Sequence, residues 1–454
     1  MGSSHLGTKP SAAICGSIPF ASHRGRVLFP RGEVPATYWP RAMTAAPPRL
    51  GEGRLKTWAT LSSMLIGPGV LTVGTAFNAS GLVIAPIVVL AMAVLCCWTM
   101  VLIAKCLDRA AILVPEKDRN GEAVDWPLVG QAVAGTLGRR AVEVMFFLEL
   151  LFASVSTQVI SGTALRVVFP GVDTALLLVI AGGATLLLLA VPETFFWWVS
   201  SAGLLAAATF AASLVASGAL LEGDIPAAGV TLADFGGAPA TLAIAATLMM
   251  AHSEIGGVYE RMDRKEHFPR VCIGAFAVVT AFYLAVGAAG YLFYGNRVRI
   301  DLLENVGFDA EGRPLPGMAW LQKLAAAMFT VKLQAVMPLL IEPLARMFET
   351  SPVCGGAAKA GNGNWMRRGG LRVACTLIPL AIAVFLRDKA EAVAELTGSL
   401  TCLSMSVLFP VLCYWKLHRP ALSMLAQTCL GVVTIVCLAA QIAGTRAAMN
   451  GFFA

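Results

Sequence analysis

Eleven long runs of apolar residues follow one another along the chain and dominate what it can fold into. As α-helices, runs of this kind cross the roughly 30 Å hydrocarbon core of a bilayer. Of the 454 residues, 57% are hydrophobic and 13% are charged, against about 25% charged residues in an average soluble domain. The sequence therefore predicts an all-α, polytopic membrane protein. The predicted spans are residues 58–79, 82–107, 139–165, 173–191, 196–220, 238–259, 270–294, 317–342, 370–386, 392–415 and 421–445.

The basic residues lie mainly on one side of these spans. With residues 1–57 in the cytosol, the segments on that side hold 25 of the 34 Lys and Arg residues. Seven lie on the other side, and two, Lys323 and Lys332, lie within a span. This asymmetry follows the positive-inside rule. We therefore expect a cytosolic N-terminus, a transmembrane domain over 58–445 and a short non-cytosolic C-terminus at 446–454.

The first 57 residues contain eight Lys and Arg residues but only two acidic ones. This composition is typical of a disordered basic tail, and it also fits an organelle-targeting segment. The net charge of +7 does not indicate nucleic-acid binding, because the other basic residues lie between hydrophobic spans. No Cys or Cys/His group has metal-ligand spacing. We expect neither a metal site nor a cofactor.

The first span is interrupted near its middle by Gly67-Pro68-Gly69. Glycine is a poor helix former and proline lacks a backbone N–H, so the helix should break here. A broken backbone at this depth is tolerated only where protein or a water-filled cavity surrounds it. Two interpretations follow. The break is either a kink that serves packing or a site where half-helix ends and free backbone groups meet a charged substrate.

The sixth span carries a second interruption, where His252, Ser253 and Glu254 precede Gly256 and Gly257. Ionisable residues at membrane depth cost roughly 2.5–3.5 kcal/mol each on insertion scales and usually face a cavity. One alternative is that His252 and Glu254 pair quietly in the interior; another is that the helix ends early and a loop begins at Glu254. Interruptions in spans one and six divide the chain into spans 1–5 and 6–10, as in transporters with inverted repeats.

Five segments carry a family resemblance. They are IGPGVLTVGTAFNASGLVIAPIVVL in the first two spans, HSEIGGVYERM in the sixth, FPRVCIGAFAVVTAFYLAVGAAGYLFYG in the seventh, FTVKLQAVMP in the eighth and ELTGSLTCLSMSVLFPVLCYWKL in the tenth. Over about residues 55 to 445 the chain resembles the amino acid/auxin permeases of the amino acid–polyamine–cation superfamily, including neutral and proton-coupled amino acid transporters. The resemblance implies a five-plus-five inverted repeat with discontinuous helices 1 and 6, an eleventh added span, and secondary active transport of amino acids by alternating access.

Two departures from the family pattern stand out. The Leu-Pro-x-Ala run after the first-span glycines reads Val73-Gly74-Thr75-Ala76 here, which leaves the fold assignment intact. Lys332 replaces a small or apolar residue, two positions from Thr330, which falls where sodium-coupled relatives place a hydroxyl ligand. We therefore expect sodium-independent transport coupled to protons or to exchange. Glu149 in the third span lies at a depth where it can pair with Lys332; alternatively, the lysine side chain extends toward the inner surface of the membrane.

A zwitterionic amino acid needs N–H donors for its carboxylate and acceptors for its ammonium group. The break in span one offers backbone amides, and the break in span six offers freed carbonyls. We expect Gly256 to leave room for a substrate side chain, and Ser63 to line the cavity or to serve helix packing. The predicted substrate-binding residues are Gly67, Gly69, Val70, Ser63, Ala251, His252, Ser253 and Gly256. The predicted coupling residues are His252, Glu254, Thr330, Lys332 and Glu149.

The role of His252 has two interpretations. Its side chain titrates near neutral pH and is a candidate proton carrier; alternatively it only hydrogen-bonds across the break. No nucleophile–base pair or metal constellation indicates an enzyme. An amino acid sensor with transporter architecture and a channel stay open as alternatives. The resemblance fits a plasma membrane or a vacuolar or lysosomal type of membrane.

Overall fold

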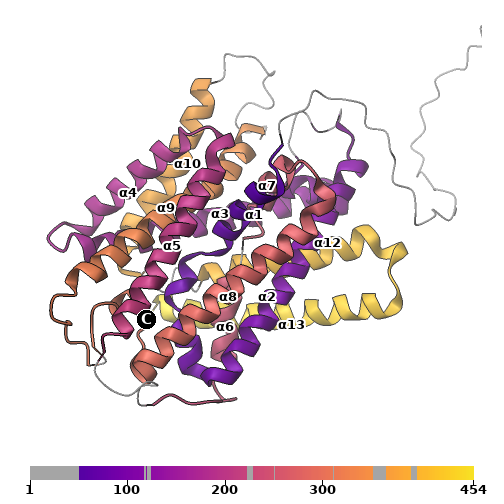
Figure 1. Cartoon of the computed structure of the whole chain (residues 1–454). Helices are drawn as coiled ribbons and strands as arrows, with labels where there is room; N and C mark the ends of the chain where they lie inside the picture. The colour runs from indigo at the N-terminus through magenta and orange to yellow at the C-terminus, as the bar shows by residue number, and fades with distance from the viewer. Residues whose placement is uncertain are drawn as a thin grey trace, which may run out of the picture. The chain divides into compact units, whose positions relative to one another are not determined.

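The computed structural model describes residues 51–116, 119, 124–221, 229–249, 251–309, 311–350, 365–389 and 396–453. Within these ranges the regular structure is helical, and β-pairing is limited to two isolated bridges. The all-α prediction is confirmed (Figure 1). Of the predicted tail 1–57, the first 50 residues lie outside the described part of the chain.

The first span breaks where its glycines and proline predicted. Helix α1 runs over Arg54–Leu65, a 3₁₀ turn η1 covers Pro68–Leu71, and helix α2 begins at Val73. Pro68 stands at the first position of η1, where its missing N–H costs nothing because that amide would have no partner within the turn. The predicted discontinuity of span one is confirmed.

Helix α2 (Val73–Leu113) joins the end of span one to span two through one sharp bend at Gly81. Gly81 has φ 83° and ψ 178°, a conformation that only glycine adopts readily. A Cβ there would lie 2.8 Å from the backbone of Leu232, because the segment before α6 passes directly over the bend. Val83 N–H donates to the Leu232 carbonyl at 2.8 Å. The bend and the overlying segment therefore fix each other.

The sixth span is also divided. Helix α6 covers Ala238–Leu248, helix α7 covers Ile255–Arg261, and the residues between them that the structure describes are non-helical. The polar residues His252, Ser253 and Glu254 lie at the break as predicted, whereas Gly256 and Gly257 lie within α7. The alternative in which the helix ends and a loop begins at Glu254 is wrong, because α7 starts directly after that residue.

The other helices follow the predicted spans. They are α3 (Trp126–Val168), α4 (Thr174–Leu189), α5 (Phe196–Gly218), α8 (Phe268–Tyr294), α9 (Ala319–Thr350), α10 (Trp365–Phe385), the π-helical segments η10 (Thr397–Cys402) and η11 (Ser404–Leu408), α12 (Phe409–His418) and α13 (Met424–Phe453). Of these, α3, α9 and α13 extend beyond the predicted spans at one or both ends. Helix α9 outruns its predicted end at residue 342 because ion pairs continue along it, and α13 continues through most of the predicted C-terminal tail.

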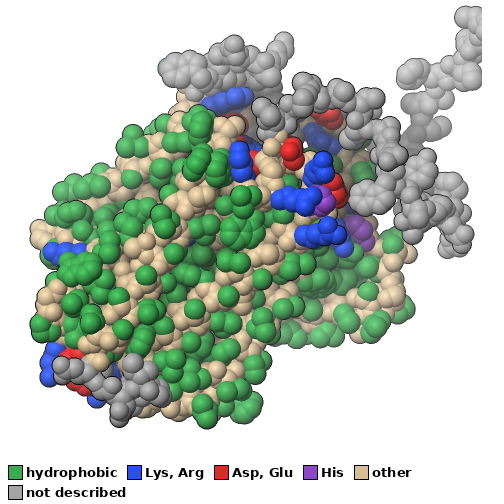
Figure 2. Space-filling model, in the orientation of Figure 1, with side chains coloured by type: hydrophobic (Ala, Val, Ile, Leu, Met, Phe, Trp, Pro, Cys, Tyr) green, Lys and Arg blue, Asp and Glu red, His purple; other side chains and the backbone are tan. Residues whose placement is uncertain are grey.

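Within the described ranges, eight helices are long and apolar enough to cross a membrane, and α4 and α6 are shorter apolar helices. The number of eleven spans therefore stays a prediction. Helices α2 and α8 lie side by side, and α9 packs against both α3 and α5 (Figure 1). In Figure 2 apolar side chains cover the flank of the bundle, while charged side chains gather at the end where α1 and α7 lie and in a smaller patch at the opposite end.

Candidate functional site

The broken end of α1 is completed by a tyrosine from α8. The hydroxyl of Tyr283 accepts a hydrogen bond from Gly67 N–H at 3.2 Å and donates one to the Leu65 carbonyl at 3.1 Å. Tyr283 is fully buried. Both groups belong to the helix end, where backbone donors and acceptors lack intrahelical partners. Sequence reasoning missed Tyr283; its polar ring in the apolar seventh span was the available signal.

Lys332 of α9 binds the same end of α1. Its Nζ lies 2.9 Å from the Ser63 carbonyl oxygen and 3.4 Å from Ser63 Oγ, and the side chain has no exposed surface. The carbonyl end of a helix carries partial negative charge, which favours a cation. Ser63 therefore contacts the lysine in this structure, and its hydroxyl lies at the α1–α9 packing contact.

The expected pair between Lys332 and Glu149 is absent from the described structure. Helices α3 and α9 do pack against each other as expected, but the amine of Lys332 turns to α1. The carboxylate of Glu149 instead faces Thr401 and Cys402 in the π-helical segment of span ten. The similar depth of the two residues in the membrane suggested the pair. Their side chains, however, point in different directions around their helix axes, so they do not meet.

Gly67 borders open space. A Cβ built on Gly67 meets no atom within 4 Å, whereas one on Gly69 would lie 2.8 Å from Cδ2 of Leu248 in α6. The amide of Val70 donates to the Gly67 carbonyl at a long 3.4 Å, and Val70 itself is buried. The two broken spans thus meet at Gly69 and Leu248, and the room beside them lies at Gly67.

His252 ties the second break to the surrounding helices. Its Nε2 lies 3.0 Å from the Cys96 carbonyl oxygen and 3.1 Å from Thr99 Oγ1, both on α2. Because a carbonyl only accepts, Nε2 carries a hydrogen in this arrangement. The His252 carbonyl accepts a hydrogen bond from the Trp126 indole of α3 at 2.9 Å. Nδ1 is buried without a hydrogen-bond partner among the described residues.

The neighbours of His252 are buried as well. Ala251 and Ser253 have 1% and 2% of their surface exposed. The room that we expected beside Gly256 is taken, because a Cβ there would collide with the carboxylate of Asp125. Asp125 caps α3 by accepting a hydrogen bond from Trp126 N–H at 2.8 Å. Gly256 therefore provides close packing against the start of α3, and a substrate side chain would have to extend elsewhere.

We expect His252→Gln to keep the pH dependence of transport, because the contacts of His252 are those of a residue that positions the break. A glutamine amide can still donate to Cys96. His252→Ala should lower the melting temperature, since losing a buried hydrogen bond and stranding its partners costs about 1–3 kcal/mol. Uptake across the physiological pH range and thermal unfolding in detergent measure both effects. A flattened pH profile in the glutamine variant would restore His252 as a proton carrier.

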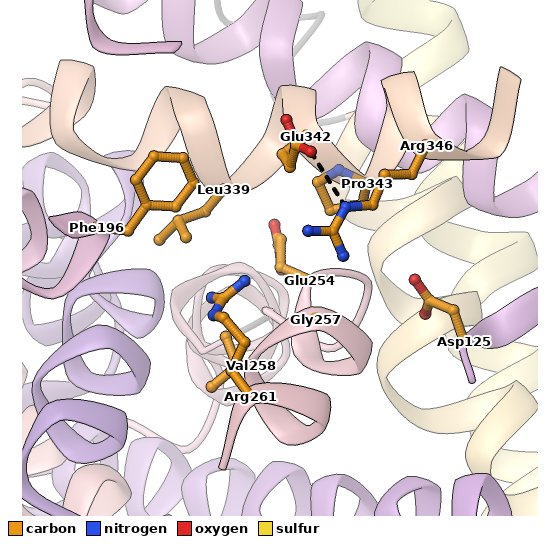
Figure 3. A pocket seen from close by; sticks show the side chains of 10 residues that line it. All are labelled: Asp125, Phe196, Glu254, Gly257, Val258, Arg261, Leu339, Glu342, Pro343 and Arg346. Atoms are coloured by element: carbon orange, nitrogen blue, oxygen red, sulfur yellow. Dashed lines mark hydrogen bonds and ion pairs between the residues drawn. The ribbon is translucent and has the colours of Figure 1, made fainter. Parts of the chain in front are cut away.

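Glu254 lines a pocket between α7, α9 and the start of α3 (Figure 3). The pocket is small, with a cavity volume of about 20 Å³, and it is partly open to solvent. Oε2 of Glu254 is buried and has no hydrogen-bond partner among the described residues. The residues that line the pocket are Asp125, Phe196, Glu254, Gly257, Val258, Arg261, Leu339, Glu342, Pro343 and Arg346.

The arginines of this pocket join four helix ends through ion pairs. Arg261 at the end of α7 lies 3.3 Å from Glu52 and 3.5 Å from Glu193. Arg346 of α9 binds Glu193 and lies 3.1 Å from Glu342. Backbone hydrogen bonds add to this link, because the amide of Glu52 donates to the Arg261 carbonyl at 2.7 Å. The network joins these segments at the end of the bundle that we predict to be cytosolic.

The remaining predicted coupling residue, Thr330, hydrogen-bonds within its own helix. Its hydroxyl donates to the Ala326 carbonyl of its own helix at 2.9 Å. The described residues contain no group of three or more His, Cys, Asp or Glu side chains placed to hold a metal ion. The polar chemistry of the site thus lies in the two broken spans and in the helix ends that meet Tyr283 and Lys332.

Residues 52–449 match the model of a family described as transmembrane amino acid transporter protein. Among similar proteins, amino acid transporter AVT1D of Arabidopsis thaliana is 24% identical over 374 residues, which cover 80% of this chain and 63% of AVT1D. The chain thus spans less than two thirds of that relative. Amino acid transporter AVT1I of the same plant is 25% identical over 80% of this chain and 85% of its own length.

Two solved transporter structures share the fold. The manganese transporter of Eremococcus coleocola has a TM-score of 0.56 at 13% identity and covers 88% of this chain and 87% of its own. MhsT in complex with L-phenylalanine has a TM-score of 0.55 at 12% identity and covers 87% of this chain and 98% of its own. These matches confirm the predicted fold, and the helix bounds of this chain show the discontinuous first and sixth spans.

Proposed function

Because the chain belongs to the transmembrane amino acid transporter family, we propose that it is a secondary active transporter that moves amino acids across a membrane by alternating access. The observation that carries this proposal is the open space at Gly67, bordered by the break in span one and close to the end of α6. The similarity to proteins named amino acid transporters and to MhsT, whose structure contains L-phenylalanine, supports an amino acid as the substrate.

The substrate is bound by its charged ends. Its carboxylate accepts hydrogen bonds from amides of the segment from Gly67 to Val70. In part it does so by displacing the hydroxyl of Tyr283 from the Gly67 amide. Its ammonium group donates hydrogen bonds to carbonyls of the non-helical stretch between α6 and α7. This arrangement uses backbone groups at half-helix ends, where amides and carbonyls lack the hydrogen bonds of a continuous helix.

Transport is independent of sodium. The amine of Lys332 occupies the carbonyl end of α1, and the hydroxyl of Thr330 is bound to its own helix. At an effective dielectric constant of about 20, two positive charges about 4 Å apart repel each other by roughly 4 kcal/mol. An ammonium group at this place therefore excludes a sodium ion. Uptake is instead driven by protons or by exchange for a second substrate molecule. The protein resides in the plasma membrane or in a membrane of the vacuolar or lysosomal type.

Purified protein in liposomes tests this function. Uptake of a panel of radiolabelled amino acids, followed by counterflow against an internal unlabelled pool, should reveal saturable exchange of at least one amino acid. A sensor with transporter architecture would bind the amino acid without flux, and a channel would conduct without counterflow. Liposomes without protein and liposomes with heat-inactivated protein are the controls.

Replacing external sodium by potassium or choline should leave the initial rate of uptake unchanged, because Lys332 excludes the ion. The internal pH and the membrane voltage are held fixed in this measurement. Uptake that rises steeply with a sodium gradient would contradict the assignment of Lys332. A pH gradient applied in the same liposomes should instead raise uptake if protons are coupled.

A further inference from the structure

Two buried carboxylates belong to the region of the second break. Glu254 precedes α7 and Glu149 lies on α3; the two side chains are 7% and 2% exposed. Each has an Oε2 atom that is buried without a hydrogen-bond partner among the described residues. The two carboxylates are close enough to repel each other when both are ionised. Two neighbouring ionised carboxylates without a cation between them are highly unfavourable in a low-dielectric interior.

The two arginines of the pocket and Lys332 of α9 are bound to other groups. Lys332 donates to the carbonyl of Ser63, Arg261 lies between Glu52 and Glu193, and Arg346 binds Glu193 and Glu342. In the described part of the chain no ion pair reaches Glu254. A buried carboxyl that lacks a cation is stable only in its neutral, protonated form or with a bound cation.

Glu254 has a route to water. Its side chain lines the pocket between α7 and α9, and Figure 3 shows it directed toward Glu342 and Arg346 on the opposite wall. The pocket is partly open to solvent at the end of the bundle that we predict to be cytosolic. Water can therefore approach this carboxyl from the predicted inner face, whereas Glu149 does not line the pocket.

Several other ionisable groups surround Glu254, and an experiment has to distinguish their protonation from that of Glu254. Around the pocket these are Asp125 before α3, Arg261 on α7, and Glu342 and Arg346 on α9. Outside the pocket, Glu149 of α3 and Cys402 of span ten also interact electrostatically with Glu254. Burial raises the pKa of Asp125 to about 7, so Asp125 is the pocket residue that competes as a proton carrier.

We propose that Glu254 binds the coupled proton of this transporter and exchanges it with the predicted inner aqueous phase through the pocket that it lines. The proposal rests on the proposed function as an amino acid transporter. The transferred proton forms an O–H bond with the carboxylate of Glu254 while the site faces outward, and this bond breaks when water in the pocket accepts the proton. Glu254 adjoins the break between α6 and α7, so the opening of this break changes the side from which water reaches it.

Proteoliposomes that contain a pH-sensitive dye test the proposal with Glu254→Gln, which is isosteric with the protonated carboxyl. The amino acid is the one found in the uptake panel. In the wild-type protein, adding this amino acid outside should acidify the lumen. In the variant this acidification and pH-driven accumulation should fall by at least about tenfold, whereas counterflow should fall much less, because exchange requires no net proton movement. Acidification at the wild-type ratio to substrate flux would overturn the proposal.

Asp125→Asn is the matched control. It makes the same change in the same pocket, and asparagine caps a helix as well as aspartate, so coupling should persist. Glu149→Gln should keep coupling too. If either of these variants lost coupling while Glu254→Gln retained it, the substituted residue would be the proton carrier. That result would overturn the proposal.

Wild-type protein gives a second test that needs no variant. An apolar carbodiimide reacts with protonated carboxyl groups, and peptide mass spectrometry locates the adduct. We expect labelling of Glu254 at acidic pH that declines at alkaline pH; no adduct at Glu254 at acidic pH would contradict the proposal. Wild-type counterflow without proton movement would also refute it, whereas absence of counterflow in the wild-type protein would count against the proposed function itself.

Discussion

Uptake is expected to fall by about a hundredfold or more when Gly67 is replaced by leucine, with little change in folding. Gly67 has φ −104° and ψ −163°, an extended conformation that any residue adopts, and a Cβ there meets open space. The leucine side chain therefore fills the room that we assign to the substrate without strain in the backbone. Initial uptake rates and the melting temperature in detergent separate the two effects.

Gly183→Leu provides the matched control for this variant. Gly183 lies in the apolar helix α4, is exposed, and has no atom within 4 Å of a built Cβ. The same substitution there should leave uptake and melting temperature close to wild type. Gly69→Leu is less informative, since a Cβ at Gly69 already approaches Leu248 to 2.8 Å and the variant would disturb α6. Normal transport by Gly67→Leu would show that the substrate does not bind beside Gly67.

The second large effect is expected from Lys332→Met, which removes the amine that binds the end of α1. The buried carbonyl of Ser63 then lacks this donor, which costs about 1–3 kcal/mol. We expect a lower melting temperature and at least about a tenfold loss of uptake, because the end of α1 borders the substrate space. Lys323→Met is the control, since Lys323 lies on the same helix but is exposed. Equal effects of both variants would rule out a specific role for the contact with Ser63.

The structure also changes what a double variant should do. If Lys332 paired with Glu149, as the sequence suggested, Glu149→Gln would partly rescue Lys332→Met by removing an unpaired carboxylate. Because Lys332 binds Ser63 and Glu149 faces span ten, the two substitutions should instead act independently. The melting temperatures of the two single variants and the double variant form a cycle that measures this. A coupling well above about 0.5 kcal/mol would show that the two residues interact after all.

The features that the sequence could predict are those that depend on a residue and its near neighbours along the chain. Apolar runs of sufficient length made the chain a helical membrane protein. Gly67-Pro68-Gly69 broke the first span because proline lacks a donor and glycine resists the helix. The polar stretch around His252 broke the sixth. Both breaks lie where the sequence placed them, and the unusual charge of Lys332 was also visible.

The partners of these groups were decided only by the tertiary structure. Lys332 meets Ser63 across 269 residues of sequence, and Tyr283 meets Gly67 across 216. Span boundaries give the depth of a side chain in the membrane but not its direction around the helix axis, so Glu149 looked as suitable a partner as any. Packing of α9 against α1 set that direction. A buried polar group then binds whichever helix end the packed helices bring within reach, because leaving it unpaired costs more than the contact gains.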